Sequence, residues 1–169
     1  LMMDGGIQVN SHGQRFSNEH DGYSEQGRRV IAQPGHVAWN VFDARLYEFG
    51  MDFDDFRQAV AAGAILTAPS VSELAETCGL PESNFTSTME QVSRLASGDG
   101  TDEFGRDFTA GPALQAPYHA VKVTGSLFHT QGGLLVDGNA RVLRADNSPF
   151  PNLYAGGGAA RGVSGPADW

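Results

Sequence analysis

Glycine is distributed unevenly along this chain, and that pattern limits the folds that the chain can adopt. The sequence contains 22 glycines in 169 residues, which is well above the usual frequency of about 7%. They concentrate in the first 35 and the last 40 residues, whereas the segment between carries regular apolar patterns. Because glycine lets a backbone turn sharply and approach a ligand closely, we expect ligand-facing loops at both ends of a conventionally packed middle.

The composition predicts a soluble globular protein of one-domain size, since 40% of its residues are hydrophobic. A net charge of −9 argues against nucleic acid and anionic membrane surfaces as partners, but a small-molecule substrate is compatible with it. The single cysteine, Cys78, excludes an internal disulfide, and no apolar run reaches membrane-spanning length. We therefore expect a cytoplasmic protein, and the ends at Leu1 and Trp169 indicate a piece of a longer polypeptide.

Apolar spacing predicts both helices and strands, and so an α+β chain. Ser70 and Glu73 fit a capping box at the start of a helix, and Gly79 is suited to its end. The first strand is expected to turn back through 11–14 as a small hairpin, and 134–136 is expected to pair with 140–143. The predicted helices cover 22–33, 53–60, 70–78 and 81–96, and the predicted strands cover 5–10, 36–43, 118–123, 134–136, 140–143 and 152–155.

The segment 128–134 combines polar side chains with two glycines. His129 and Thr130 carry directional hydrogen-bonding groups, and Gly132 and Gly133 would let the backbone approach a flat ligand. The same pattern is common where a turn leads into a strand. On these residues alone, a ligand site and an ordinary turn stand about equal.

The tail carries Gly156, Gly157 and Gly158 directly after a predicted strand, as a dinucleotide-binding loop does. Its spacing departs from G-x-G-x-x-G, because Arg161 stands where the third glycine belongs. A second glycine-rich contact to a dinucleotide and a flexible loop before a further helix are both compatible with this sequence.

Arg15 and Glu19 lie four residues apart and could form an ion pair that fixes their loop. Tyr23 follows after four more residues and could move a proton if a nearby charge lowered its pKa from about 10. A surface salt bridge beside a packed tyrosine is the structural alternative.

The acidic loop 97–105 suggests calcium at first sight, because it contains Asp99, Asp102 and Glu103. The loop lacks the alternating ligands and the terminal bidentate glutamate of an EF-hand. We therefore expect a solvated loop, and we expect no metal site in the chain.

Four segments in collinear order resemble the FAD-dependent fumarate reductase and succinate dehydrogenase flavoprotein superfamily, whose soluble branches include ketosteroid dehydrogenases. They cover 6–10, 13–19, 129–133, and 152–158 together with 162–165. The resemblance implies a capping domain at 5–127, with helices and a small mixed sheet, followed by a β-rich return segment of an FAD-binding domain at 128–169. It also implies a fragment of an oxidoreductase that moves a hydride between FAD and a C–C bond of an α,β-unsaturated carbonyl or carboxylate substrate.

The same resemblance assigns roles to individual residues. His129 and Thr130 would bind substrate, and Arg15 and Glu19 would belong to a proton path. Tyr23 stands where the reductases carry a proton-donating arginine and where ketosteroid dehydrogenases carry a tyrosine base. The residues expected along the FAD are Gly132, Gly133, Gly156, Gly157, Gly158, Val163 and Ser164.

Two departures in the tail bear on the substrate and the cofactor. Many relatives carry a glutamate where Gly158 stands, and the reductases carry a substrate-clamping arginine where Asp168 stands. Without that arginine, a dicarboxylate would lose a bidentate partner, so we expect a substrate less anionic than fumarate. Because the chain lacks G-x-G-x-x-G, the alternative is a non-catalytic cap-like module without bound flavin.

Overall fold

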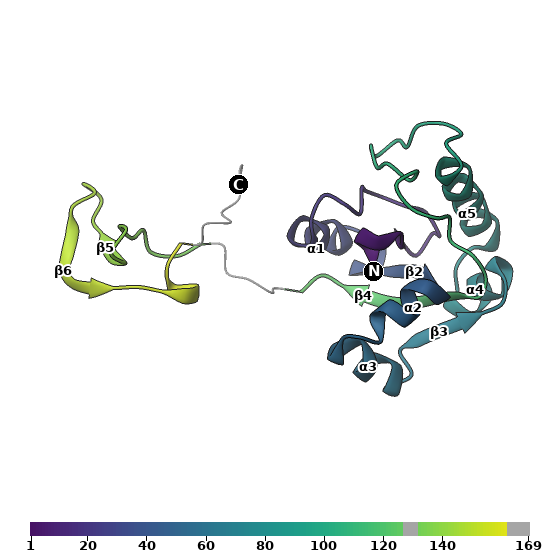
Figure 1. Ribbon diagram of the computed structural model, residues 1–169, viewed down its shortest axis with the longest axis horizontal. Coiled ribbons are helices and arrows are strands. Elements are labelled where there is room, and N and C mark those ends of the chain that lie inside the picture. Colours follow the sequence, from purple (N-terminus) through teal and green to yellow (C-terminus); the bar gives the residue numbers. More distant parts are fainter. Residues whose placement is uncertain (127–131, 162–169) are drawn as a thin grey trace. The chain divides into compact units, whose positions relative to one another are not determined.

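A computed structural model describes residues 1–126 and 132–161, without the side chains of residues 23 and 24. The chain forms two compact units, Leu1–Ser126 and Leu127–Trp169 (Figure 1). Helices occur with antiparallel sheets, which agrees with the expected α+β class.

The first unit is built on a four-stranded sheet in the order β1-β2-β4-β3. The strands cover Ile7–Val9 (β1), Val37–Asp43 (β2), Ile65–Ala68 (β3) and Tyr118–Thr124 (β4). All of its pairings are antiparallel, so the expectation of a mixed sheet is wrong. The longest pairing joins β2 to β4 from Val37 opposite Thr124 to Asp43 opposite Tyr118.

The expected hairpin after β1 is also wrong, because β1 pairs with β2 instead. A turn does form there, and the side-chain oxygen of Asn10 accepts hydrogen bonds from the backbone N–H groups of His12 and Gln14. Beyond this turn the chain leaves the sheet, and Arg15 makes its polar contacts with side chains outside the sheet.

Five helices complete this unit: Tyr23–Ile31 (α1), Ala44–Gly50 (α2), Asp54–Ala61 (α3), Val71–Cys78 (α4) and Glu82–Ala96 (α5). Ser70 caps α4 as expected, since its hydroxyl accepts from the N–H of Glu73, and Gly79 ends the helix with a φ of 67°. The sequence patterns missed α2 and β3. Asp43 ends β2 and caps α2 without an intervening turn, which removes the usual loop signal. Within the described residues, none of the helices has the length and apolar character needed to cross a membrane.

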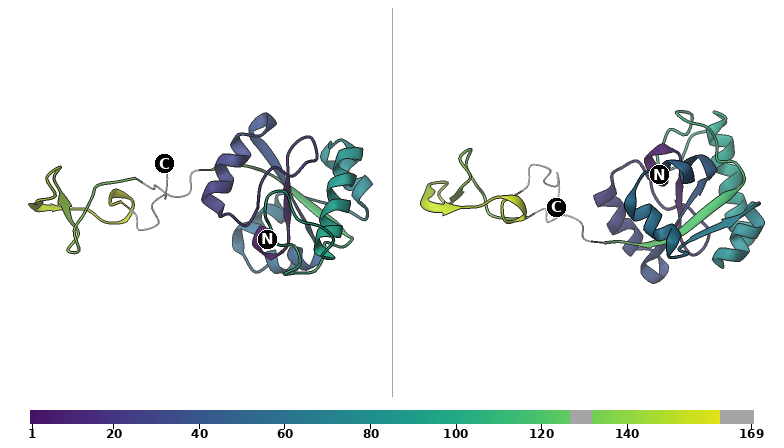
Figure 2. Two further views of the ribbon diagram at one scale, coloured as in Figure 1. Left: turned by 90° about the horizontal axis from the view of Figure 1, so that it is seen from above. Right: turned by 60° about the horizontal axis from the view of Figure 1, so that its bottom comes forward.

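The sheet separates two groups of helices (Figure 2). The helix α1 lies on one side of it, and α4 and α5 lie on the other. Ile7, Val9 and Val41 are fully buried and share one core with Phe85 and Met89 of α5. Side chains alternate across a strand, so Gln8 and Asn40 point away from that core and toward α1, where Gln26 meets Gln8.

The second unit contains a two-stranded sheet of Arg141–Leu143 (β5) and Pro149–Tyr154 (β6). The expected strand 134–136 is reduced to two isolated bridges, from Val136 to Val142 and from Leu134 to Ala160. The main partner of β5 is therefore β6 rather than 134–136.

Candidate functional site

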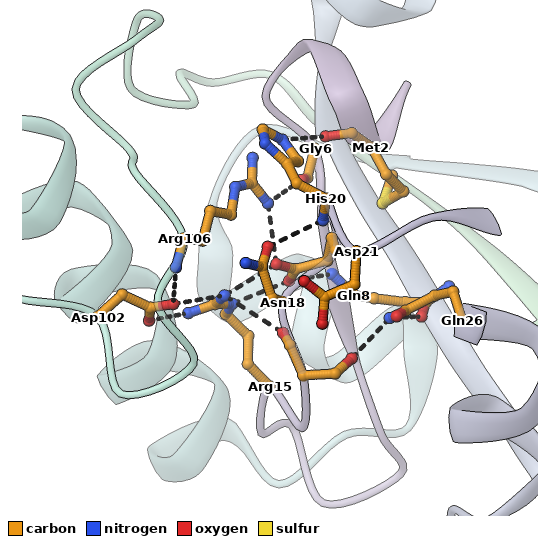
Figure 3. A network of polar contacts seen from close by, with 12 residues as sticks. Met2, Gly6, Gln8, Arg15, Asn18, His20, Asp21, Gln26, Asp102 and Arg106 are labelled. Atoms are coloured by element: carbon orange, nitrogen blue, oxygen red, sulfur yellow. Dashed lines mark hydrogen bonds and ion pairs between the residues drawn. The ribbon is translucent and has the colours of Figure 1, made fainter. Parts of the chain in front are cut away.

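Four charged side chains from two distant loops form a buried cluster in the first unit (Figure 3). Arg15 and Glu19 lie between β1 and α1, and Asp102 and Arg106 lie between α5 and β4. None of the four side chains is more than 5% exposed. The expected ion pair of Arg15 with Glu19 is thus present, but in the interior rather than on the surface.

The carboxylate of Glu19 lies at the centre of this cluster. Arg15 donates to it twice, from Nε to Oε1 and from Nη2 to Oε2, each at 2.8 Å. The backbone N–H of Gln8 donates to Oε1 at 3.0 Å, and Nη1 of Arg106 donates to Oε2 at 3.0 Å. With two donors on each oxygen, Glu19 is fully hydrogen-bonded as an anion.

Asp102 completes the cluster by pairing with the outer edge of Arg15 at 2.5 Å and accepting from the backbone N–H of Arg106 at 3.1 Å. Arg106 also donates to the carbonyl of Gly6 at 2.8 Å. Two positive and two negative groups therefore balance. The ring of Phe108 lies 4.7 Å from the guanidinium carbon of Arg15 and 4.3 Å from that of Arg106.

Burial opposes ionisation of these groups, and their partners decide the outcome. Burial raises the pKa of Glu19 and the pKa of Asp102. Hydrogen bonds and charges from Arg15 outweigh this effect and lower both pKa values below their ordinary values. Both carboxylates raise the pKa of Arg15 despite its burial. Burial and the neighbouring Arg15 lower the pKa of Arg106 in spite of Glu19. The cluster therefore holds both carboxylates ionised.

The expectation that the acidic loop 97–105 is solvated holds for only part of the loop. Asp99 and Glu103 are exposed as predicted, but Asp102 is only 5% exposed and is bonded to Arg15. Asp102 and Arg106 were missed as members of the cluster because their partners lie 87 residues away in the sequence. Among the described residues, no group of three or more potential metal-binding side chains is present.

A cavity of about 550 Å³ opens beside this cluster, and Glu19 lies in its wall. Gly22 also lines it and precedes Tyr23, the first residue of α1, whose side chain lies outside the description. The remaining lining residues are Leu1, Met2, Met3, Gln8, Gln26, Gly27, Val30, Asn40, Val123, Thr124, Gly125 and Ser126. Its size is that of a cavity for a small organic molecule.

In the second unit, the two glycine-bearing segments lie side by side. The N–H of Leu134 donates to the carbonyl of Ala159 at 2.9 Å, and the N–H of Arg161 donates to that of Leu134 at 3.0 Å. Gly133 adopts a φ of 137°, and a Cβ there would lie 2.6 Å from the carbonyl carbon of Ala160, so only glycine fits. Four of the candidate residues lie outside the described residues: His129, Thr130, Val163 and Ser164.

The family described as "FAD binding domain" matches residues 1–168, and thus both units. The chain belongs to this family. Its cofactor is FAD, as the resemblance implied. In the second unit of this FAD-binding family member, a Cβ added at Gly156, Gly157 or Gly158 would meet nothing within 4 Å. These three residues therefore present an open backbone that a flat or phosphate-bearing group can approach.

Relatives of this FAD-binding chain include two kinds of oxidoreductase. NADH:fumarate oxidoreductase of Klebsiella pneumoniae (strain 342) is 31% identical over 162 residues, which are 95% of this chain and 17% of that protein. The 3-oxosteroid 1-dehydrogenase of Mycolicibacterium smegmatis (strain ATCC 700084 / mc(2)155) is 30% identical and is matched over 95% of this chain and 34% of its own length. The chain therefore spans only a minor part of each of these relatives.

A solved structure shows the same fold over almost the whole chain. The open conformation of a flavocytochrome c3 fumarate reductase superimposes with a TM-score of 0.67 at 30% sequence identity. The superposition covers 97% of this chain and 28% of that one.

Proposed function

We propose that this chain is the capping segment and the return segment of an FAD-dependent oxidoreductase that acts on a C–C bond next to a carbonyl group. The observation that carries the proposal is the family match through both units, together with relatives named for reduction of fumarate and for dehydrogenation of 3-oxosteroids. In this proposal, residues 5–127 cap the substrate and residues 128–169 return to the FAD-binding domain.

Bound FAD would supply the group that exchanges a hydride with the substrate carbon. Gly132, Gly133 and the open backbone at 156–158 would lie along it, with Val163 and Ser164. His129 and Thr130 would hold the oxygen of the substrate by hydrogen bonds. These assignments rest on the resemblance and on the accessible glycines.

Tyr23 would move the proton that accompanies the hydride. The proposed proton route continues to Glu19 and Arg15, and Glu19 accepts a proton only when one of its four donors moves away. In the closed cluster, Arg15 and Glu19 fix the loop that leads into α1, which begins at Tyr23 directly after Gly22 of the cavity wall.

A neutral ketone suits this site better than a dicarboxylate. Among the described residues, those that line the cavity include no lysine, arginine or histidine, and the charged side chain among them is the carboxylate of Glu19. A dianionic substrate would therefore find no cationic side chain among these residues to pair with its carboxylates. A tyrosine at position 23, where fumarate reductases carry an arginine, favours the same substrate class.

The test is an activity assay of the FAD-loaded protein that carries this chain, with an artificial electron acceptor and 4-androstene-3,17-dione. Reduced viologen with fumarate provides the opposite assay. We expect desaturation of the ketone, and we expect Tyr23→Phe to lower kcat by about 10²–10⁴ with a smaller change in KM. Tyr118→Phe, in β4, is the matched control.

Normal turnover by Tyr23→Phe would remove the proposed role of the tyrosine. Turnover of fumarate without any reaction of the ketone would overturn the substrate class. A protein that neither takes up FAD nor turns over either compound would support the alternative, a cap-like module without activity.

A further inference from the structure

Three amide side chains form a relay along the wall of the cavity. Gln26 of α1 donates from Nε2 to Oε1 of Gln8 at 2.8 Å, and Gln8 donates from Nε2 to Oδ1 of Asn40 at 2.7 Å. Gln8 and Asn40 are cross-strand partners of β1 and β2, so the sheet fixes their spacing. Gln8 and Gln26 point toward one another in Figure 3. Each amide therefore orients the next one.

This relay leaves one buried acceptor without a partner. Both N–H groups of the Gln26 amide are used, because Nε2 also donates to the hydroxyl of Ser17 at 2.7 Å. Oε1 of Gln26 has no hydrogen-bond partner within the described parts of the chain, although the residue is only 7% exposed. A buried acceptor left unsatisfied destabilises the site, so a ligand that supplies a donor at this point gains affinity.

The rest of the wall indicates an uncharged ligand. Leu1, Met2, Met3, Val30 and Val123 provide apolar contacts. The carboxylate of Glu19 is already fully hydrogen-bonded by the cluster and offers no further acceptor to a ligand. Among the described side chains of this wall, Gln26 therefore carries a buried acceptor that still lacks a partner.

We propose that Gln26 determines specificity in this cavity, where its Oε1 accepts a hydrogen bond from a hydroxyl group on an uncharged, largely apolar ligand. The proposal treats this cavity as the site for one end of the substrate, and in that respect it rests on the proposed function. Binding is nevertheless measurable on the 169-residue chain without any flavin chemistry, because every residue of the cavity lies in the unit Leu1–Ser126.

The test compares two ligands of equal size by isothermal titration calorimetry. One is 4-androstene-3,17-dione, and the other is its 17-hydroxy analogue, which replaces one carbonyl acceptor with a hydroxyl donor. We expect the hydroxy compound to bind the wild-type chain about tenfold more tightly, as one hydrogen bond to an unsatisfied buried acceptor allows. The side-chain amide resonances of Gln26 are expected to shift on binding.

Gln26→Met removes the acceptor and keeps the length of the side chain, so we expect the preference to fall below about twofold. Gln58→Met, on the exposed surface of α3, is the matched control and should retain the preference. If Gln26→Met does not fold, the wild-type preference and the Gln26 amide shifts decide the question.

Four outcomes would overturn the proposal: equal binding of both compounds, binding of neither, a preference that survives in Gln26→Met, or a preference for the dione. The last would mean that the relay runs in the opposite sense and presents an N–H group to the cavity. Loss of desaturase activity with the hydroxyl preference intact would count against the proposed function alone.

Discussion

The two units bury their side chains to very different extents. In the first, Phe42, Leu74 and Phe85 are fully buried within one continuous core. In the described part of the second, Val142 is the only buried side chain, and Leu134 and Tyr154 are 49% and 60% exposed. Because burial of apolar surface drives folding, the first unit has a core of its own, while the described part of the second depends mainly on hydrogen bonds.

Two ion pairs with the same sequence spacing make this difference concrete. Arg15 and Glu19 lie four residues apart in the first unit, and their side chains are 5% and 0% exposed. Asp137 and Arg141 lie four apart in the second, and theirs are 21% and 36% exposed. The same spacing thus gives a buried cluster in one unit and a solvated pair in the other.

The largest expected effect comes from breaking the buried pair. Arg15→Met leaves Glu19 and Asp102 in the interior without their shared partner, which should lower the free energy of unfolding by about 3–5 kcal/mol. Arg141→Met should lower it by less than about 1 kcal/mol, since water screens that pair. Urea denaturation followed by circular dichroism measures the first change, and hydrogen exchange at β5 measures the second. Similar losses from the two changes would contradict the contrast in burial.

A matched pair of leucines tests the apolar part of the comparison. Leu74 is fully buried in α4, so Leu74→Ala should cost about 2–5 kcal/mol of stability through lost burial and a new cavity. Leu153 is 44% exposed in β6, and Leu153→Ala should cost less than about 1 kcal/mol. The same denaturation experiment applies to both. A large loss from Leu153→Ala would show a core in the second unit.

Features with local causes could be predicted from the sequence. The cap at Ser70, the stop at Gly79 and the pair of Arg15 with Glu19 each depend on residues within four positions of one another, and the structure confirms all three. The glycine segments carried a recognisable pattern as well, although their roles at the cofactor stay predictions.

Features that depend on distant partners could not be found in this way. The aspartates of the acidic loop look alike in sequence, yet Asp102 is buried because Arg15 and Arg106 bind it, while Asp99 is exposed. The pairing of β1 with β2 likewise joins residues about thirty positions apart, and the local turn signal after β1 favoured a hairpin. The relay through Asn40, Gln8 and Gln26 needs the sheet register before it can be recognised.

The smallest expected effect is a pH dependence that belongs to the first unit. His119 of β4 is 7% exposed, its Nδ1 lies 2.9 Å from the hydroxyl of Thr67, and its Nε2 has no partner in the part of the chain that the structure describes. Burial lowers the pKa of His119 below 6.5, although the charge of Asp43 opposes this. Near pH 6.5 the folded protein therefore binds less proton at His119 than the unfolded chain does.

It follows that stability from this residue is complete above pH 6.5 and is lost as the pH falls toward the lowered pKa. The loss is at most about 1.4 kcal/mol per pH unit, which is the limit for one proton. Denaturation of the first unit between about pH 7.5 and 5.5 should show this slope.

Two variants test the assignment to His119. His119→Gln, which can still hydrogen-bond Thr67, should flatten the pH slope of stability, and His12→Gln, at an exposed position, should leave the slope unchanged. Since residues 132–161 contain no histidine, hydrogen exchange there should stay free of this slope once corrected for its intrinsic pH dependence. A slope that persists in His119→Gln would assign the titration to another group.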